Sequence, residues 1–580
     1  MLKKLLLVAG LALPLVLSAQ QTNILSTNPL AEQILLGNYN PADYAPGLTN
    51  PAPAELAAQL NVRISPDSLQ ATILKLATFH NRNSGSDTLS PFTGIGAARR
   101  WTYHKFQQYG AASNGRLIAS YLQFAQQICS VGQHRDIFAV LPGTDPSHHG
   151  VILVEGHIDS RCETLCDTAC LALGVEDNAT GTALVLELAR VMSQFSYPHT
   201  IIFMVTIAEE QGLYGAAAMA QYLQQKNIPL RAVLNNDVIG GIICGKTSSP
   251  PSCSGFNDID STSVRMFSQG GFNSLHKQLA RFIKLEYREN LLPVVAVPMN
   301  LRVMSPEDRT GRGGDHQPFR QLGFTAMRFT SANEHGDASN APGYTDRQHT
   351  SEDVLGVDTD NDGAVDSFFV DFNYLARNTV INANAAAMAA YGVPTPADFN
   401  GSRLGNQLTV NIVDTAQVGN YRVALRSVSA DWDTVYTLAG AATGVFPCNP
   451  TGALFLSVSA VNAQGVESLF TGEKIIAVST GTAEPGDQAE PNIRLFQNKP
   501  NPFDEATWLS FWVNTVPAYH SASLQITDLQ GKVVENLPVR LQPGLNETLY
   551  THGYGVHGTF AFTLIIDGRP VESRQMVFAN

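Results

Sequence analysis

Charged residues are scarce in this sequence, and basic ones are in the minority. They make up only 15% of the 580 residues, with 37 Lys and Arg against 50 Asp and Glu. The resulting net charge of -13 argues against nucleic acid or an anionic membrane surface as a partner, because both repel an acidic protein. Beyond the N-terminus there is no apolar run long enough for a transmembrane helix. The length and the 44% hydrophobic content instead predict several globular domains.

The N-terminus has the pattern of a targeting signal. Residues 1–19 combine a basic start, a short apolar stretch and small residues before Gln20. This is the pattern of a secretory signal peptide, and the stretch is too short to span a membrane. We therefore expect an exported protein.

Cysteine is also rare, with seven residues in the whole chain. Export permits disulfides, and Cys244 and Cys253 flank a loop rich in Gly, Pro and Ser, so we expect them to pair. The run CETLCDTAC, residues 162–170, matches no common zinc spacing and predicts a local disulfide instead. The odd count leaves at least one cysteine as a free thiol or in an intermolecular bond.

The apolar pattern divides the chain into one α/β part and two all-β parts. Residues 20–64 show little periodicity and are interpreted as an N-terminal extension or propeptide. Over residues 65–393, short β-branched runs alternate with helical segments, which predicts a mixed central sheet with helices on both faces. Residues 394–480 and 493–580 alternate with a period of two and predict two β-sandwich domains. The Pro-, Gly- and acid-rich residues 481–492 predict a linker between them.

Acidic and imidazole side chains follow the predicted strands of the α/β part at their carboxyl ends. They are His157 and Asp159 after one strand, Glu209 and Glu210 after the next, and Asp237 after a third. In α/β sheets, binding crevices form beyond these strand ends, so we expect the side chains to lie close together. A single one is ordinarily a hydrogen-bonded bystander or a helix cap. Their repetition at successive strand ends favours a shared site.

The composition of this set points to a metal. A mixture of imidazole and carboxylate ligands suits zinc. Glu209 and Glu210 are adjacent like charges, which become tolerable when divalent cations neutralise them. A further acid, Asp177, lies where a helix is predicted to begin. The pattern therefore predicts a metal centre in which the two neighbouring glutamates have different roles.

Five motifs in this order, GHIDS, EDNATG, AEEQGLYGA, NNDVIGG and RQHTSED, resemble peptidase family M28, the co-catalytic zinc aminopeptidases. The resemblance covers about residues 65–393. It implies a zinc exopeptidase fold of the phosphorylase/hydrolase-like type and a cofactor of two zinc ions. It also implies that the chain hydrolyses N-terminal peptide bonds in peptide or protein substrates.

The resemblance distributes five ligands over the two zinc ions. His157 and Asp237 would bind one ion, and Glu210 and His349 would bind the other. Asp177 would bridge the pair. Two zinc ions held about 3.5–4 Å apart can activate one water molecule between them and polarise the scissile carbonyl.

The resemblance also assigns roles beside the ligands. Glu209 would be the general base that takes a proton from the attacking water. Asp159 would orient the imidazole of His157. Members of the family commonly have a cis peptide bond between the residues that correspond to Asp177 and Asn178, and we expect one here.

Three histidines compete for the last ligand position. The HTSED context of His349 matches the ligand of the family, whereas His316 lies in a separate family motif, GGDHQPF, and His335 lies in NEHGD. This sequence has Gly314 where some relatives have Ser, and the tyrosine that some relatives use to support the oxyanion is not evident. Arg312 is a candidate for that role, and a purely structural arginine is an equal alternative.

A second metal pattern follows His349. Asp358, Asp360, Asp362 and Asp366 are spaced like the start of a calcium loop, but Phe369 replaces the glutamate that closes a full EF-hand. Two interpretations stay open: a structural Ca²⁺ site that braces the segment after His349, and an acidic surface turn.

The all-β parts carry resemblances of their own. The last predicted hairpin of residues 394–480 resembles that of a fibronectin type III-like domain. Residues 493–580, with FQNKPNPF, ITDLQGK and the closing SRQMVFAN, resemble the type IX secretion sorting domain of Bacteroidetes. This implies the type IX secretion machinery as a partner, and passage through the periplasm to the medium or the cell surface.

Three functional alternatives stay open beside the aminopeptidase. Glutaminyl cyclases resemble the family but use one zinc ion and lack the first histidine, so His157 and Asp159 argue against them. Carboxypeptidase-type relatives keep both metals; the 20-residue interval from His157 to Asp177 favours the aminopeptidase branch. A non-catalytic surface binding protein on a peptidase scaffold would have no reason to retain all five ligands and Glu209.

Overall fold

The computed structural model describes most of the chain. The described residues are 21–44, 48, 52–145, 150–245, 255, 257–270, 273–309, 311–333, 347–427, 429–449, 454–476, 493–503, 506–515, 521–528, 532–552 and 558–578. The predicted signal peptide and the predicted linker lie outside them. No helix in these ranges combines the length and apolarity needed to cross a membrane.

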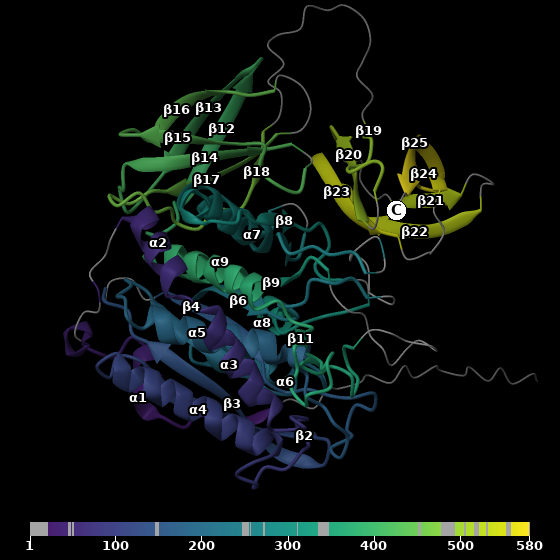
Figure 1. Cartoon of the computed structure of the whole chain (residues 1–580). Helices are drawn as coiled ribbons and strands as arrows, with labels where there is room; N and C mark the ends of the chain where they lie inside the picture. The colour runs from purple at the N-terminus through teal and green to yellow at the C-terminus, as the bar shows by residue number, and fades with distance from the viewer. Residues whose placement is uncertain are drawn as a thin grey trace, which may run out of the picture.

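A nine-stranded mixed sheet forms the centre of the α/β part (Figure 1), with strand order β1-β2-β3-β5-β4-β6-β9-β7-β8. The strands are β1 Thr22–Ser26, β2 Ile118–Ile128, β3 Val131–Leu141, β4 Val151–His157, β5 Thr200–Thr206, β6 Leu230–Asn236, β7 Ser263–Phe267, β8 Asn300–Val303 and β9 Ala326–Ser331. The central strands β5, β4, β6 and β9 are parallel, so their carboxyl ends meet at one edge. The remaining pairs are antiparallel except β7 with β8.

Helices cover both faces of this sheet, as predicted. They are α1 Pro29–Leu35, α2 Pro53–Arg63, α3 Pro66–Ala77, α4 Gly94–Ala112, α5 Thr180–Met192, α6 Tyr214–Gln225, α7 Leu275–Glu286, α8 His316–Gln321 and α9 Phe372–Tyr391. The chain crosses from β4 through α5 to β5 in one direction, and from β5 through α6 to β6 in the other. Because such crossovers are right-handed, α5 and α6 lie on opposite faces. Helix α9 packs beside α5, and α8 packs beside α6.

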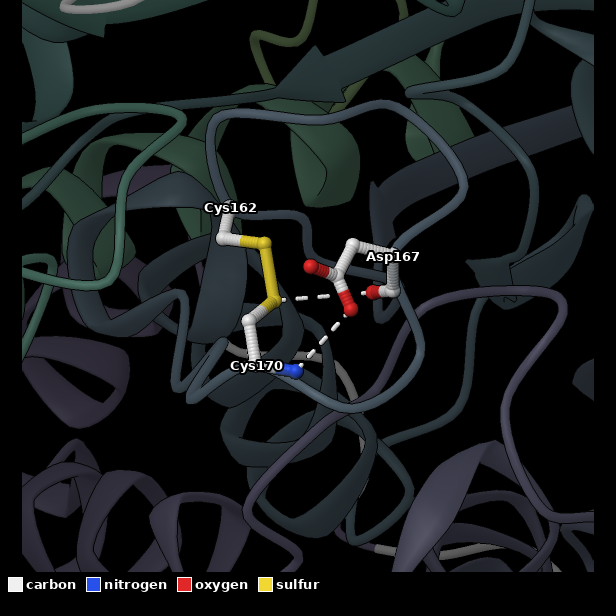
Figure 2. Close-up of side chains that lie close together, drawn as sticks. All are labelled: Cys162, Asp167 and Cys170. Atoms are coloured by element: carbon white, nitrogen blue, oxygen red, sulfur yellow. Dashed lines mark hydrogen bonds between the residues drawn. A yellow bond between two sulfur atoms is a disulfide. The ribbon is translucent and has the colours of Figure 1, made fainter.

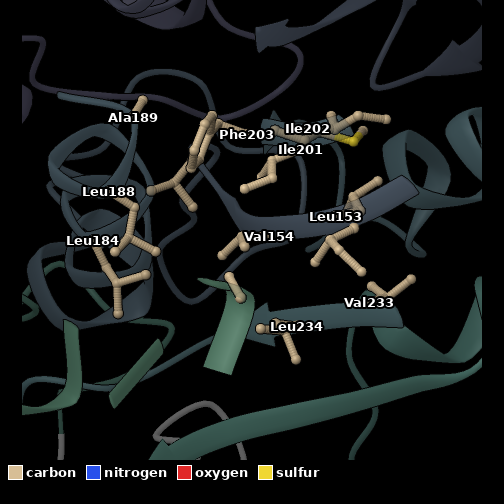
Figure 3. Close-up of a cluster of buried hydrophobic side chains, with 14 of the residues drawn as sticks. Leu153, Val154, Leu184, Leu188, Ala189, Ile201, Ile202, Phe203, Val233 and Leu234 are labelled. Carbon is tan, nitrogen blue, oxygen red and sulfur yellow. The ribbon is translucent and has the colours of Figure 1, made fainter. Parts of the chain in front are cut away.

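The core of the sheet consists of aliphatic side chains on strands that are buried along their whole length. Every residue of β4 and β5 is buried. Figure 3 shows Leu153, Val154 and Phe203 of these strands, with Leu188 of α5 among the surrounding side chains. Each fully buried side chain of this size stabilises the fold by about 1.5–3 kcal/mol. The sheet is therefore a rigid base for the residues at its carboxyl edge.

The reversal of winding direction places a crevice at the end of β4. In open α/β sheets, ligands bind outside the carboxyl ends of the strands at such a switch point. His157 is the last residue of β4, and Asp159 follows two residues later. The topology thus puts the first predicted metal ligand at the switch point.

The first described residues of the chain belong to the same packed body. Strand β1 pairs with β2 at the edge of the sheet, and α2 packs against α9. Leu56 and Leu60 of α2 are buried in the core of the α/β part. The body therefore includes residues that precede the predicted boundary at residue 65.

The two C-terminal parts are each built from two antiparallel sheets that share a buried core. The first has sheets β12-β13-β16 and β15-β14-β17-β18, and the second has β19-β20-β23 and β22-β21-β24-β25. Their strands are β12 Asp398–Leu404, β13 Gln407–Val413, β14 Asn420–Arg426, β15 Thr434–Ala439, β16 Thr443–Pro447, β17 Phe455–Ala460, β18 Lys474–Ile475, β19 Ile493–Leu495, β20 Ala506–Val513, β21 Ala522–Asp528, β22 Val533–Val539, β23 Gly544–Thr551, β24 Gly558–Ile566 and β25 Arg569–Phe578. A short hairpin, β10 Gly356–Val357 with β11 Ser367–Phe368, frames the predicted calcium loop.

Two disulfides fix the loop that follows Asp159. Cys162 pairs with Cys170, which confirms the predicted local bond (Figure 2), and Cys129 pairs with Cys166. The carboxylate of Asp167 accepts hydrogen bonds from the backbone N–H of Ala169 at 2.8 Å and of Cys170 at 3.1 Å. The loop is thus closed on itself and tied to the β2–β3 turn.

The remaining cysteines are divided between a bond and a thiol. Cys244 is in a disulfide, and its predicted partner, Cys253, lies outside the described residues. Cys448, between β16 and β17, carries a free thiol, as the odd count of cysteines requires.

A buried ion-pair cluster joins the α/β part to the first β part. Glu473 pairs with Arg281 of α7 at 2.8 Å and with Arg426 of β14 at 2.7 Å, and all three side chains are at most 5% exposed. Arg426 also lies 3.8 Å from Glu547 of β23, so the cluster reaches the C-terminal part. Phe470 extends the apolar contact because it belongs to the core of the α/β part.

We predict that Glu473→Ala destabilises the junction by about 3–5 kcal/mol, because two buried guanidinium groups lose their counter-charge. Thermal unfolding and limited proteolysis at the junction measure this loss. The neighbouring Lys474→Ala is the matched control, since the Lys474–Asp398 pair is solvent-exposed and its loss should leave the midpoint nearly unchanged. Equal midpoints for the two variants would contradict the prediction.

Candidate metal centre

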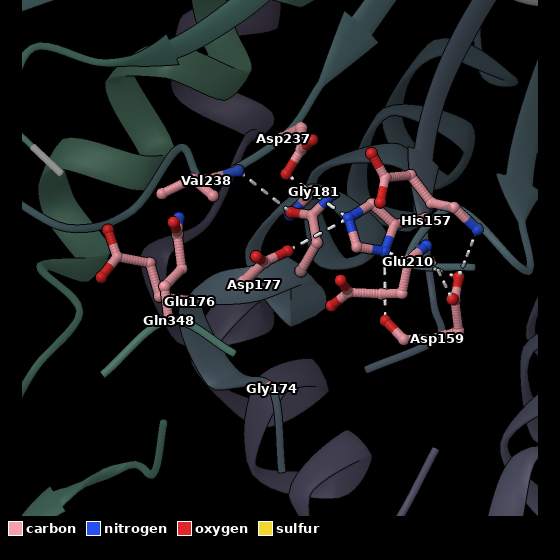
Figure 4. Close-up of polar contacts among 12 residues, drawn as sticks. His157, Asp159, Gly174, Glu176, Asp177, Gly181, Glu210, Asp237, Val238 and Gln348 are labelled. Atoms are coloured by element: carbon pink, nitrogen blue, oxygen red, sulfur yellow. Dashed lines mark hydrogen bonds and ion pairs between the residues drawn. The ribbon is translucent and has the colours of Figure 1, made fainter. Parts of the chain in front are cut away.

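Six of the predicted site residues come together at the carboxyl edge of the sheet as two groups. Figure 4 shows four of them: His157, Asp177, Glu210 and Asp237. One group is His157, Glu209 and Asp237; the other is Asp177, Glu210 and His349. Within each group the candidate ligand atoms lie within 4.8 Å of one another. The end of β4, the loops after β5 and β6 and the turn before α5 supply five of these residues, and the segment that begins at residue 347 supplies His349.

Asp177 connects the two groups through its two carboxylate oxygens. Its Oδ1 lies 3.2 Å from Nε2 of His157, and its Oδ2 lies 3.0 Å from Nε2 of His349. The peptide bond between Asp177 and Asn178 is cis, as the resemblance implied. The two distances show that the carboxylate faces both histidines at once, which is the arrangement that a bridging ligand needs.

The spacing of the other atoms fits zinc. Nε2 of His157 lies 3.4 Å from Oδ1 of Asp237, and Nε2 of His349 lies 3.2 Å from Oε2 of Glu210. Ligand atoms about 2.0–2.1 Å from one zinc ion at tetrahedral angles are about 3.3 Å apart. The Oε1 atom of Glu210 is buried and has no hydrogen-bond partner, so this carboxylate oxygen is available to a metal ion.

The electrostatics of the centre are dominated by buried acids. Burial opposes ionisation of Asp177, but hydrogen bonds from His157 and His349 outweigh it and hold the pKa of this carboxyl well below its usual range. Burial raises the pKa of Glu209 well above its usual range, and the charge of Asp237 adds to the effect. Four carboxylates thus face two imidazoles, an excess of negative charge that suits divalent cations.

The backbone beside the ligands is held in an uncommon conformation. Ala208, which precedes Glu209, has φ 60°; Val238, which follows Asp237, has φ 55°; and His349 itself has φ 60°. Non-glycine residues in this left-handed region cost about 1–3 kcal/mol each, and such residues cluster where a site dictates the side-chain direction. Here they aim three different loops at one point.

The chain matches the family model described as peptidase family M28 over residues 136–370, a range that contains the whole centre. It is 30% identical over 404 residues to a probable zinc metalloprotease of Leptosphaeria maculans, covering 66% of this chain and 89% of the relative. The chain belongs to peptidase family M28. The members of this family are zinc metallopeptidases, so the chain is a metallopeptidase.

Other relatives and solved structures are similar to this M28 peptidase. A probable zinc metalloprotease of Pyricularia oryzae is 31% identical over 441 residues, covering 72% of this chain and 84% of the relative. The Legionella pneumophila LapA aminopeptidase has a TM-score of 0.41 at 18% identity, over 59% of this chain and 75% of that one. A leucine aminopeptidase precursor from Bacteroides thetaiotaomicron has a TM-score of 0.35 at 14% identity, over 56% and 97%.

Asp159 positions the two glutamates as well as the first histidine. Its carboxylate accepts a hydrogen bond from the backbone N–H of Glu209 and another from that of Glu210, each at 3.2 Å. Its backbone carbonyl accepts Nδ1–H of His157 at 3.1 Å, whereas its nearer carboxylate oxygen is 3.6 Å from that nitrogen. In this M28 peptidase, Asp159 thus orients His157 mainly through its main chain and the glutamates through its side chain.

Of the three competing histidines, only His349 lies in a metal group among the described residues. His316 is buried at the start of α8, and burial lowers its pKa to about 4. A neutral, enclosed imidazole in neither group is a core residue rather than a ligand. His335 lies outside the described residues.

Asp353 is a site residue that the sequence reasoning did not single out, although it ends the quoted motif RQHTSED. Its Oδ1 accepts the backbone N–H of Glu176 at 2.9 Å, and its Oδ2 accepts that of Asp177 at 3.0 Å. It therefore ties the turn that carries the bridging carboxylate to the segment that carries His349.

Two buried arginines were also missed. Arg82 is fully buried and donates to the carbonyls of Ile158 at 2.7 Å and Gly174 at 3.0 Å, so it joins the end of β4 to the turn before Asp177. Arg328 of β9 pairs with Oδ2 of Asp237 at 3.0 Å. No local motif marks either residue, because both act across long sequence separations.

The predicted calcium loop is partly assembled. Asp358, Asp360 and Asp366 have carboxylate oxygens within 4.8 Å of one another, but Asp362 is not part of this group. The Asp358 carboxylate accepts the backbone N–H of Gly363 at 2.8 Å, which shapes the turn. Calcium binding stays a prediction.

We predict that Asp353→Ala weakens zinc binding about 10- to 100-fold, because outer partners of metal ligands typically contribute this much. Competition with a chromogenic chelator measures the change. Glu352→Gln is the control, since the adjacent Glu352 side chain is exposed and lies in neither group. Unchanged zinc affinity in Asp353→Ala would refute the positioning role.

Proposed function

We propose that this M28 peptidase is a di-zinc aminopeptidase that removes N-terminal residues from peptides. The observation that carries the proposal is the placement of Asp177, with one carboxylate oxygen toward each histidine. His157 and Asp237 would hold one zinc ion, and Glu210 and His349 would hold the other. When bound, the ions supply Lewis acidity to the attacking water and to the scissile carbonyl.

Glu209 has the position and the environment of a general base. It lies in the group of His157 and Asp237, and its own backbone N–H is fixed by Asp159. Its carboxylate would accept a proton from the attacking water and donate it to the nitrogen of the leaving amine. Because Glu210 pairs with His349 and would bind a metal ion, the two neighbouring glutamates would have different roles.

The floor of the cleft favours a free amino terminus. Asp177, Glu209, Glu210 and Asp237 line the cavity above the centre. An α-ammonium group beside Glu209, the one of these carboxylates that is not assigned to zinc, would be stabilised by charge, whereas a substrate carboxylate at the same place would be repelled. Relatives named aminopeptidases among the solved structures are consistent with this choice.

We predict about two zinc ions per chain, and release of residues only from peptides with a free amino terminus. Removing the metal with a chelator should abolish turnover, and adding zinc should restore it. Glu209→Gln should retain both ions and lower kcat about 10²- to 10⁴-fold, since it removes the proton acceptor. Glu352→Gln serves as the control with normal zinc content and turnover.

The other outcomes discriminate between the alternatives. Two zinc ions with cleavage of N-blocked peptides that have free carboxyl ends would identify a carboxypeptidase. One zinc ion with cyclisation of N-terminal glutamine would identify a glutaminyl cyclase. No zinc and no turnover would leave a surface binding protein on a peptidase scaffold.

We further propose that the enzyme is exported and that residues 493–580 act as a type IX sorting domain, after a fibronectin type III-like domain at 394–480. The support is the signal pattern of residues 1–19, the resemblance of the tail, and the separate buried core of that tail. Deleting residues 493–580 should retain the enzyme in the periplasm of a host that has the type IX machinery. Immunoblots of periplasm, cell surface and medium measure this, and normal secretion of the truncated chain would disprove the sorting role.

A further inference from the structure

Acidic and basic side chains both line the cleft above the metal centre. Its volume is about 330 Å³. Its acidic lining residues all belong to the centre: Asp177, Glu209, Glu210 and Asp237. Its other charged lining residues are all basic: Arg161, Arg309 and Arg312. In a chain with a net charge of -13, these three arginines nearly balance the four acids of the cleft.

The described lining offers little to an apolar side chain. Leu213 is its only aliphatic residue, and the rest are charged residues, glycines, one glutamine and His349. A pocket selective for leucine or phenylalanine is lined mainly by hydrophobic and aromatic side chains. The described part of the lining therefore does not fit the recognition of a large apolar residue.

Arg309 is held in place by a chain of ion pairs that starts at the metal centre. Arg328 pairs with Asp237 at 3.0 Å and with Asp308 at 3.1 Å, and Asp308 in turn pairs with Nε of Arg309 at 3.1 Å. Burial opposes ionisation of Asp308, but Arg328 and Arg309 outweigh it and hold the pKa of this carboxyl well below its usual range. Asp308 is thus a fixed anion that orients Arg309.

Arg312 is oriented by a different residue of the cleft, Gln348. Its Nη2 donates to Oε1 of Gln348 at 2.9 Å, and Gln348 precedes the metal ligand His349. Arg161 differs, because it contacts the ligands themselves: its Nε lies 3.3 Å from Oε2 of Glu210, and its Nη2 lies 2.7 Å from Nδ1 of His349. We therefore assign substrate recognition to Arg309 and Arg312 and leave Arg161 with the centre.

We propose that Arg309 and Arg312 bind a carboxylate of the substrate next to the scissile bond, so that this peptidase prefers acidic peptides. The inference rests on the proposed function. Guanidinium groups match a carboxylate with two parallel hydrogen bonds, and groups already oriented bind at a lower entropic cost. Two sources supply this chemistry: the side chain of an N-terminal Glu or Asp, and the free α-carboxylate of a dipeptide.

Matched peptides separate the two sources. The zinc-loaded full chain is assayed on Glu-Ala-Ala-amide against Gln-Ala-Ala-amide, and on Ala-Ala against Ala-Ala-amide. The members of each pair differ in one charge at nearly constant shape. A carboxylate that is hydrogen-bonded by arginine should raise kcat/KM about 10- to 100-fold within its pair. A higher kcat/KM for the charged member of the first pair would show that the arginines bind the side-chain carboxylate. A higher kcat/KM for Ala-Ala in the second pair would show that they bind the α-carboxylate.

Substitutions then locate the recognition. Arg312→Gln should reduce the ratio within the responsive pair to near one, and Arg312→Glu should invert the preference toward Lys-Ala-Ala-amide. Arg309→Gln should act in the same direction, with zinc content measured because Arg309 is linked to Asp237. Arg302→Gln is the control: Arg302 is a 47% exposed arginine of β8 that pairs with Asp260 and does not line the cleft.

Binding to Glu209→Gln separates this inference from the proposed function. Calorimetry of Glu-Ala-Ala-amide and Gln-Ala-Ala-amide on this variant measures recognition without turnover. Turnover with ratios near one in both pairs, or ratios that Arg312→Gln leaves intact, would overturn the inference while the aminopeptidase stands. A charge-dependent difference in binding without turnover in the parent would support the inference and overturn the proposed reaction.

Discussion

The mutual repulsion of acids at the carboxyl edge of the sheet is the constraint on which the rest of the structure depends. Asp177, Glu209, Glu210 and Asp237 meet there with only two imidazoles among them. Three sets of contacts hold these acids. Asp177 contacts both histidines, and Asp237 pairs with Arg328. The carboxylate of Asp159 accepts the backbone N–H groups of Glu209 and Glu210. Divalent cations relieve the repulsion within such a cluster, so metal binding would stabilise the fold.

The surrounding scaffold has the rigidity that this cluster requires. Strands β4 and β5 are buried along their whole length, and the chain directly after β4 is fixed by Arg82 and by the disulfides of the following loop. Left-handed backbone at Ala208 and Val238 is tolerated because each residue closely follows a buried strand of the packed sheet. The rigid sheet thus fixes the geometry of a site whose candidate ligands come from several loops.

The same fixed charges extend from the metal into the substrate cleft. The pairs from Asp237 through Arg328 and Asp308 to Arg309 alternate in sign, and each is buried. A continuous series of ion pairs therefore connects the proposed metal centre with the arginines of the cleft. The Glu473 cluster at the domain junction is likewise a set of buried ion pairs, in which two arginines share one carboxylate.

The sequence alone predicted the α/β class, the local disulfide and the two groups of side chains that the structure brings together, because short strand runs and adjacent motifs record local structure and chemistry. His349 was chosen over His316 from its context, and the structure places only His349 among the carboxylates. Tertiary structure alone decided that residues before 65 join the sheet and that Asp353, Arg82 and Arg328 brace the ligands. It also decided that Asp159 acts on His157 mainly through its carbonyl and that Arg309 and Arg312 face one cleft. These contacts join residues far apart in the chain, and their partners are set by how strands and loops pack, which no local pattern contains.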